Sequence, residues 1–228
     1  MKITPTLRFD FRSAACSALL ALFGVAAQAQ VEIPGYPSNW DAYDPREVAL
    51  LPPWCVYTEM FRMKRVPGGE NSETFARWQA FFGKDSFHHL HHYCWALMKT
   101  NRGLYLAREP WLRQSYLGYT IEEFDYVIDR VPDDFVLLPE ILTKKGENLV
   151  RLRKGPVAVM SFERAAELKP DYWPPYAQLS DYYKSIGDTT KAREILEKGL
   201  SSSPDATALK RRLLEIGDGK STATKTSR

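Results

Sequence analysis

All four histidines of the chain lie in one short stretch, FHHLHHYC, which covers residues 87–94 and ends at a cysteine. Histidine is the commonest metal ligand among protein side chains. His88 and His92 are four residues apart, which lets two imidazoles on one helix reach the same zinc, copper or nickel ion. A catalytic zinc normally takes three protein ligands, and His91 is the candidate third. The stretch therefore supports a metal site at His88, His91 and His92.

Two other interpretations of these histidines remain open. The rings can instead pack at helix interfaces, with His91 beside Trp95. Clustered histidines also repel one another when protonated, so the stretch can act as a pH-sensing surface. The glutamate of the HExxH protease motif is missing, as are a C-x-x-C-H haem motif, a G-x-S-x-G element and a glycine-rich phosphate loop. The sequence thus predicts no enzyme activity.

The compartment matters for this chemistry, and residues 1–29 have the pattern of a secretory signal peptide. Basic residues precede an apolar run of fourteen residues, and small residues at Ala27 and Ala29 form an A-x-A-like cleavage site. A membrane-spanning helix needs about 20 apolar residues, so the run favours cleavage after Ala29 over an anchor. No later segment is long and apolar enough to span a membrane. We expect an exported protein that is periplasmic or secreted.

The charge of the remaining chain is nearly balanced. The whole chain has 31 basic and 28 acidic residues, and loss of residues 1–29 removes three basic residues and one acidic residue. This leaves 28 and 27, a net charge of +1. Nucleic-acid binders normally show a basic face or stripe, so nucleic acid is not an expected partner.

Cys16 leaves with the signal, so the mature chain has two cysteines, Cys55 and Cys94. Two cysteines in an oxidising compartment usually pair. A Cys55–Cys94 disulfide would close a loop of about 40 residues and stabilise the fold by about 3 to 4 kcal/mol in the chain-entropy model. The alternative is a pair of buried free thiols.

A period of 34 residues runs through the C-terminal part of the chain. Four residues recur at this offset, so that Ala158, Glu163, Pro170 and Asp171 return as Ala192, Glu197, Pro204 and Asp205. A 34-residue period with small, large, small and proline positions resembles the tetratricopeptide repeat, a pair of antiparallel helices.

Residues 173–206 fit the pattern of that family closely, with Ser180 in place of its usual glycine. The matching positions are Tyr176, Leu179, Ser180, Tyr183, Ala192, Leu196, Gly199 and Pro204. Residues 139–172 form a divergent unit that lacks the aromatics of the first helix but keeps Leu142, Gly146, Leu149, Ala158, Phe162, Ala165 and Pro170. The two units cover about a third of the mature chain.

Local signals place the helices of the second unit. Pro174 and Pro175 fit the first turn of a helix, Gly187 can end it in a left-handed cap, and Asp188 can cap the next helix. One helix pair cannot bury its own apolar face, and at least three units are usually needed. We therefore expect further helices on both sides of residues 139–206.

Downstream, residues 207–217 form a predicted capping helix with an apolar stripe that Gly217 ends, and residues 218–228 are a predicted disordered tail. Upstream, residues 30–71 form an irregular strap held at Cys55. Residues 72–138 are helical and contain a degenerate helix-pair repeat. We expect helices over 72–82, ended by Gly83, and from Phe87 to Arg102, capped by Asp85 or Ser86 and ended by Gly103. Thr120–Glu123 has the form of a capping box for another helix.

The predicted histidine helix has one apolar face. At 100° per residue, one arc holds Phe87, Leu90, Cys94, Leu97 and Met98, so Cys94 points inward. His91 lies at the edge of this face, and His89 points away from it. The inward position of Cys94 favours its pairing with the strap.

The expected fold is all-α, with stacked antiparallel helix pairs that form a short right-handed solenoid. The resemblance, to the exported bacterial type of these repeat proteins, implies a non-catalytic scaffold without a cofactor. Such a scaffold holds a segment of a partner protein on the concave surface lined by the first helix of each pair. In this chain the resemblance implies that the partner-binding positions are Glu140, Thr143, Glu147, Arg151, Ala177, Asp181 and Lys184. Their mixed charge favours a polar segment as the ligand. The export signal suggests an envelope assembly, and the alternative is an exported metal-binding or redox protein that uses the His88–His92 helix.

Overall fold

The computed structural model describes residues 43–223, with side chains as far as Gly217, and within them every regular element is a helix. The predicted signal peptide, residues 30–42 of the strap and residues 224–228 of the tail lie outside the described residues. No helix in the described part is long and apolar enough to cross a lipid bilayer.

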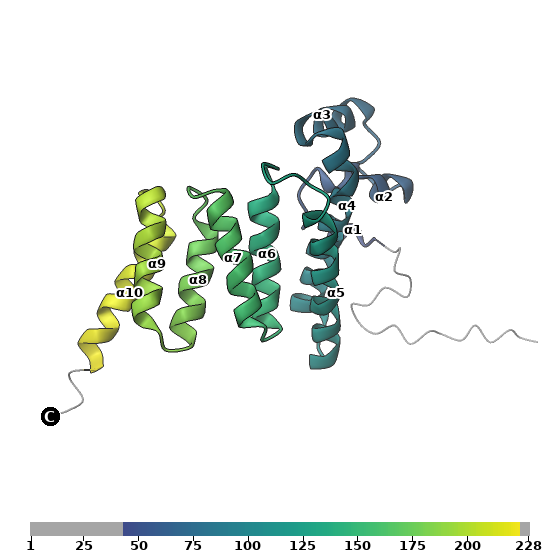
Figure 1. The fold of residues 1–228 in the computed structure, drawn as a ribbon. Helices are drawn as coiled ribbons and strands as arrows, with labels where there is room; N and C mark the ends of the chain where they lie inside the picture. Colours follow the sequence, from purple (N-terminus) through teal and green to yellow (C-terminus); the bar gives the residue numbers. More distant parts are fainter. Residues whose placement is uncertain (1–42, 224–228) are drawn as a thin grey trace, which may run out of the picture. The chain divides into compact units, whose positions relative to one another are not determined.

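The elements follow one another as short helices and then long ones (Figure 1). The short elements are α1 (Pro45–Val48), the 3-10 helix η1 (Cys55–Tyr57), α2 (Glu59–Met63) and α3 (Ser72–Phe82). The long ones are α4 (Lys84–Asn101), which continues as the π-helical η2 (Arg102–Leu106), then α5 (Pro110–Ile128), α6 (Leu138–Arg151), α7 (Gly155–Leu168), α8 (Pro174–Ser185), α9 (Thr189–Ser202) and α10 (Thr207–Ala223). From α4 to α10 each long helix packs on the next, so the predicted stack of antiparallel helix pairs is confirmed.

Small residues let the paired helices approach closely. A Cβ atom added to Gly146 in α6 would lie 2.4 Å from the ring of Phe162 in α7. A Cβ atom added to Gly199 in α9 would lie 2.8 Å from both Tyr176 and Leu209. The positions that resemble the tetratricopeptide repeat are thus the contact points between helices.

The local signals of the second unit act as expected. The prolines begin α8, Gly187 follows it with φ +86°, and Asp188 caps α9 by accepting a hydrogen bond from the backbone N–H of Lys191 at 2.9 Å. Each terminus is therefore set by residues within the unit itself.

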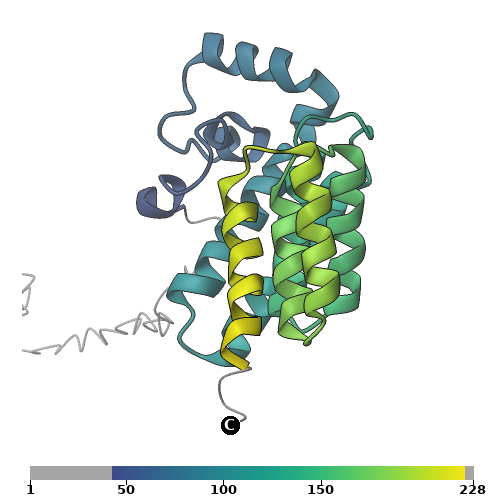
Figure 2. The ribbon, with the colours of Figure 1, turned by 90° about the vertical axis from the view of Figure 1, so that its left-hand side faces the viewer.

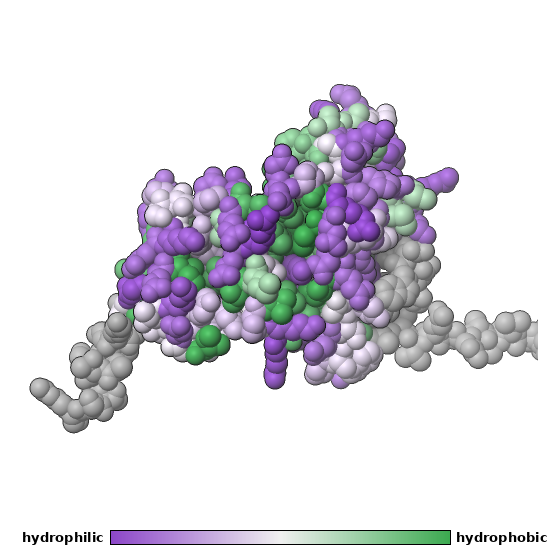
Figure 3. All heavy atoms as spheres, viewed as in Figure 1, coloured by the Kyte–Doolittle hydropathy of each residue, from purple (hydrophilic) through white to green (hydrophobic). Residues whose placement is uncertain are grey.

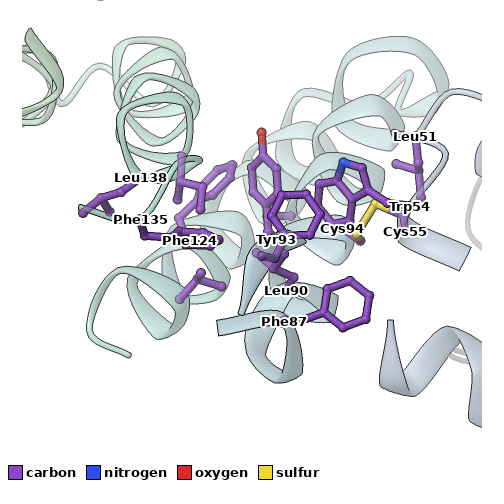
Figure 4. Close-up of a cluster of buried hydrophobic side chains, with 14 of the residues drawn as sticks. Leu51, Trp54, Cys55, Phe87, Leu90, Tyr93, Cys94, Phe124, Phe135 and Leu138 are labelled. Atoms are coloured by element: carbon purple, nitrogen blue, oxygen red, sulfur yellow. A yellow bond between two sulfur atoms is a disulfide. The ribbon is translucent and has the colours of Figure 1, made fainter. Parts of the chain in front are cut away.

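The strap packs on α4 and closes the N-terminal end of the apolar core (Figure 4). Cys55 and Cys94 are joined by a disulfide with Cα atoms 5.8 Å apart, and Trp54 stacks on Tyr93 with ring centroids 6.0 Å apart. The strap is less irregular than expected, because α1, η1 and α2 form within it. The prolines at 52 and 53 lie just before η1, where a missing N–H costs no hydrogen bond.

Two predicted boundaries of α4 are wrong. The helix begins at Lys84, because Gly83 adopts φ +79° and reverses the chain there, so neither Asp85 nor Ser86 caps it. Gly103 does not end the helix but lies in η2, where an added Cβ would be 3.2 Å from Tyr116. Its role is close packing against α5 rather than termination.

Two further boundaries are corrected. Thr120 is buried in the middle of α5, where its hydroxyl donates to the carbonyl of Leu117, so Thr120–Glu123 is no capping box. The C-terminal helix also continues through Gly217 and Gly219 to Ala223, since a helix tolerates glycines at a cost of about 1 kcal/mol each. Its predicted stripe is present, with Leu209 and Ile216 buried.

Candidate interaction face

The first helices of the pairs, α4, α6, α8 and α10, form one side of the stack, which we call the first-helix face. Contacts between α6 and α8 and between α8 and α10 join three of these helices directly. Figure 2 shows α10 and the strap on the same side of the stack. Because the strap packs on α4 and α10 packs on α8, the open part of the face lies over α6 and the adjoining side of α8.

Two of the predicted partner-binding residues are not accessible. Thr143 is 1% exposed and its hydroxyl donates to the carbonyl of Pro139, and Ala177 is 2% exposed within the apolar cluster of the C-terminal units. Neighbouring first helices lie against each other and cover the residues at their seam. Thr143 and Ala177 therefore belong to the packing and not to the surface.

Two other predicted residues hold the capping helix. Arg212 of α10 donates to both carboxylate oxygens of Asp181 at 2.8 to 3.1 Å, and Lys184 pairs with Glu215 at 3.5 Å. Asp181 and Lys184 are on the surface, but their charges are directed at α10. A partner at this position would have to compete with these ion pairs.

Glu140, Glu147 and Arg151 lie on α6, on the open part of the face. The hydroxyl of Tyr93 in α4 donates to Glu140 at 2.6 Å. Glu147 meets Lys144 at 3.3 Å and Arg151 at 3.6 Å, longer contacts than a direct charge-assisted hydrogen bond. The side-chain amide of Gln178 in α8 donates to the same carboxylate at 3.5 Å. The Glu147 side chain is 15% exposed and is held by three long contacts, so it is only partly engaged by its neighbours.

The negative charges of the two glutamates contribute to a raised pKa at two nearby tyrosines. Burial, and then the charges of Glu140 and Glu147, raise the pKa of Tyr172 to about 12. Burial and then Glu140 raise the pKa of Tyr93 well above its usual value. Tyr93 and Tyr172 were not predicted from the sequence, because they come from α4 and from the link before α8 and share no spacing with the glutamates. Lys144 was also not predicted, although it lies on α6 at helical spacing from both glutamates.

The histidine rings turn to separate partners. His88 is exposed and pairs with Glu59 of α2 at 2.7 Å, whereas the Nδ1 of His92 lies 2.6 Å from Glu123 of α5. The Nδ1 of His91 is 2.8 Å from the carbonyl oxygen of His88. Among the described residues, no three His, Cys, Asp or Glu side chains converge in a way that could hold a metal ion.

His89 and His92 both face α5. The ring of His92 stacks on Tyr126 with centroids 3.6 Å apart, and His89 lies edge-on to the same tyrosine at 5.7 Å. His89 points away from the apolar face of α4, and Tyr126 of α5 lies against its ring there. The histidines pack between elements, as in the structural interpretation of this stretch.

A buried network joins the first three helices of the stack. Asn148 of α6 donates to the hydroxyl of Thr100 in α4 at 2.6 Å and to that of Thr120 in α5 at 2.8 Å. A buried amide without partners is costly, so these contacts help fix the position of α6 on the α4–α5 pair. The α4–α5 pair therefore precedes α6 in the stack, at the position where the degenerate repeat was predicted.

Comparisons with known proteins extend this description only slightly. No protein-family model matches the chain, and no curated protein matches it in sequence. A solved structure that matches the chain is the first TPR of Spaghetti (RPAP3) bound to the HSP90 peptide SRMEEVD, at 19% identity and a TM-score of 0.41. The match covers 56% of this chain and 96% of the other.

Proposed function

We propose that this protein is a non-catalytic scaffold that binds a polar segment of a partner protein on the first-helix face, over α6 and α8. The observation that carries the proposal is the partly engaged carboxylate pair Glu140 and Glu147 beside Tyr172. Other parts of the face are buried or are covered by the strap. This patch is therefore the place where a partner could contact charged side chains.

The chemistry of the patch selects a basic side chain. A lysine or arginine of the partner would gain charge-assisted hydrogen bonds from Glu140 and Glu147. Tyr172 adds an aromatic ring that is half-buried and can pack on the aliphatic part of the same side chain. On α6, Lys144 lies between the two glutamates and Arg151 lies beyond Glu147. Both would repel a second basic residue, which favours a segment of mixed charge.

The proposed setting is the periplasm, in an envelope assembly. The signal-like pattern of residues 1–29 supports export, and the disulfide between Cys55 and Cys94 supports an oxidising compartment. Amino-terminal sequencing of the purified protein tests this setting, and a first residue of Met1 would contradict it.

Peptide arrays test the binding site. The chain is applied to twelve-residue peptides that differ only in a central lysine, arginine or glutamate. We expect a preference for the basic peptides that falls about tenfold in a Glu140→Gln, Glu147→Gln variant, the loss of about 1.4 kcal/mol. Glutamine keeps an oxygen that can accept from Tyr93, so the fold is preserved.

A matched control uses two glutamates that are one repeat apart on the second helices. Glu163 in α7 and Glu197 in α9 are exposed and lie away from the first-helix face. The Glu163→Gln, Glu197→Gln variant should bind like the wild type. Equal loss in both variants, or a preference for the acidic peptides, would contradict the proposal.

A further inference from the structure

The two ends of the helical stack differ in charge. Because the long helices alternate in direction, the turns inside the pairs lie at one end and the links between pairs lie at the other (Figure 1). We call the first end the turn edge, formed by residues 102–113, 151–155 and 184–191. The second end is the link edge, formed by residues 129–137, 167–173 and 201–206.

Basic residues gather on the turn edge. Its three segments hold eight basic and two acidic residues, whereas the link edge holds two basic and six acidic residues. The acidic residues of the turn edge are Glu109 and Asp188, and Asp188 is engaged in capping α9. The nearly balanced total charge of the chain therefore hides a separation between its two ends.

Several of these cations have no acidic partner. Arg102 is buried and bound to Glu47, and Arg151, Lys184 and Lys191 each pair with a glutamate. Four more are exposed and form no ion pair within the part of the chain that the structure describes, and these are Arg108, Arg113, Arg153 and Lys154. They belong to the turns of the first two pairs and are available to an anionic surface.

Large apolar side chains project from the same edge. Tyr105 is 72% exposed, Trp111 is 60% exposed and Ile186 is 59% exposed. Beneath the first two, Ala107, Leu112 and Tyr116 form a small buried cluster that supports the turn between α4 and α5. Figure 3 shows hydrophilic side chains interrupted by pale and hydrophobic ones along this lower edge of the stack. These side chains are spread over separate turns and not gathered in one hollow.

Arg153 keeps an unusual backbone conformation on this edge. Its φ is +60°, in the left-handed region where glycine is the usual residue after a helix. An arginine here carries a conformational cost that glycine would avoid. A cation is therefore present where backbone preference alone favours glycine.

We propose that the turn edge docks on the surface of a lipid membrane that carries anionic headgroups. Unpaired arginines and lysines attract anionic lipid, and tryptophan and tyrosine favour the boundary between headgroups and acyl chains. A planar surface meets all three turns at once, whereas an acidic protein would need a hollow to hold the dispersed apolar groups. This docking goes beyond the proposed scaffold function and leaves the first-helix face free.

Vesicle flotation tests the docking. The exported chain, with its first residue established by sequencing, is mixed with vesicles of phosphatidylcholine alone or with about a third phosphatidylglycerol. We expect binding to the anionic vesicles only, and release by 0.5 M salt because screening shortens the range of surface charges. An Arg153→Gln, Lys154→Gln variant should bind at least tenfold more weakly, and so should Trp111→Ala.

The control variant removes two cations from the opposite edge. Arg130→Gln, Lys169→Gln should keep wild-type vesicle binding, as should the Glu140→Gln, Glu147→Gln variant of the first-helix face. Arg153→Gly serves as a second variant that preserves the fold, because it suits the local backbone, and we expect about fivefold weaker binding together with a higher thermal midpoint.

Four outcomes would overturn the docking. They are absence of binding to anionic vesicles, equal binding to neutral ones, equal loss in the Arg130, Lys169 control, and unchanged binding in the turn-edge variants. Binding of soluble polyglutamate without vesicle binding would assign the edge to an acidic protein instead. Self-association in sedimentation, with no vesicle binding, would assign it to a second copy of the chain.

Discussion

His91 shows how a residue's surroundings decide between chemical roles. It is 8% exposed and its ring lies 4.4 Å from that of His92 and 5.2 Å from that of Trp95. Burial, and then the nearby His92, lower the pKa of His91 to about 4. Its Nδ1 contacts the carbonyl oxygen of His88, although this bond and the carboxylate of Glu59 act in the opposite direction on the pKa.

A pH dependence of stability follows from this shift. The folded pKa of about 4 lies below the unfolded value of about 6.5, so the unfolded state binds the proton more readily in between. The contribution of His91 to the free energy of unfolding is therefore fully present above pH 6.5. It falls as the pH drops towards 4, by up to about 1.4 kcal/mol per pH unit. Urea unfolding of the wild type between pH 7 and 5 should show this slope.

The slope should be flatter in His91→Gln, which has no titrating group at this position. The exposed His88 provides the control, and His88→Gln should keep most of the wild-type slope. Identical slopes in the wild type and His91→Gln would assign the pH dependence to other groups.

Glu123 is the second residue whose surroundings determine its role, because its carboxylate is partly buried rather than exposed on the surface. Burial acts to raise its pKa, but hydrogen bonds from His92 and Lys99 outweigh burial and leave the pKa below its usual value. The carboxylate thus stays charged between α4 and α5 and orients the ring of His92.

At the scale of the helices, close approach depends on glycine at Gly146. An added methyl group would meet the ring of Phe162, which is fully buried and has no free direction to move. Helix propensity alone predicts that alanine would stabilise α6 by about 1 kcal/mol. The contact between α6 and α7 opposes this gain.

We expect Gly146→Ala to destabilise the protein by about 1 to 3 kcal/mol, the usual cost of overpacking a core. Gly118→Ala in α5 is the matched control, because nothing lies within 4 Å of the added methyl group. That control should be neutral or more stable by up to about 1 kcal/mol. Chemical unfolding of both variants measures the difference, and a stabilised Gly146→Ala would refute the packing argument.

At the scale of the whole molecule, the disulfide joins the strap to the repeat-like stack. Cys55 and Cys94 are 39 residues apart in sequence, and both are buried in the core that also includes Phe124 of α5 and Leu138 of α6. The strap closes the apolar end of the first helix pair, as a preceding repeat would do. The cross-link limits how far the strap can separate from α4 when the chain unfolds.

Removal of the cross-link should lower stability by about 3 to 4 kcal/mol for a loop of this length. The Cys55→Ser, Cys94→Ser variant and the reduced wild type should both show this loss in guanidinium unfolding. A thiol assay on unfolded, unreduced protein should find no free thiol at these positions. Two reactive thiols, or equal stability of the variant, would rule out a stabilising disulfide.

The sequence by itself determined the helix pairs of residues 139–206, because their signals are local. Proline at a helix start, glycine in a left-handed turn and a capping aspartate act within a few residues, and the 34-residue period repeats the contacts between neighbours. The pairing of Cys55 with Cys94 follows from composition, and the structure joins them. The apolar face of the histidine helix follows from its periodicity, and most of that face is buried.

Only the tertiary structure decided which polar residues lie on the open part of the first-helix face. Thr143 and Ala177 have the right spacing for the open face, but a neighbouring helix covers them. Tyr172 joins the glutamates of α6 from a distant link, and Glu59 of α2 and Glu123 of α5 engage two histidines of α4. Periodicity specifies which side of a helix a residue occupies, but burial and partners depend on what packs there, which residues distant in sequence decide.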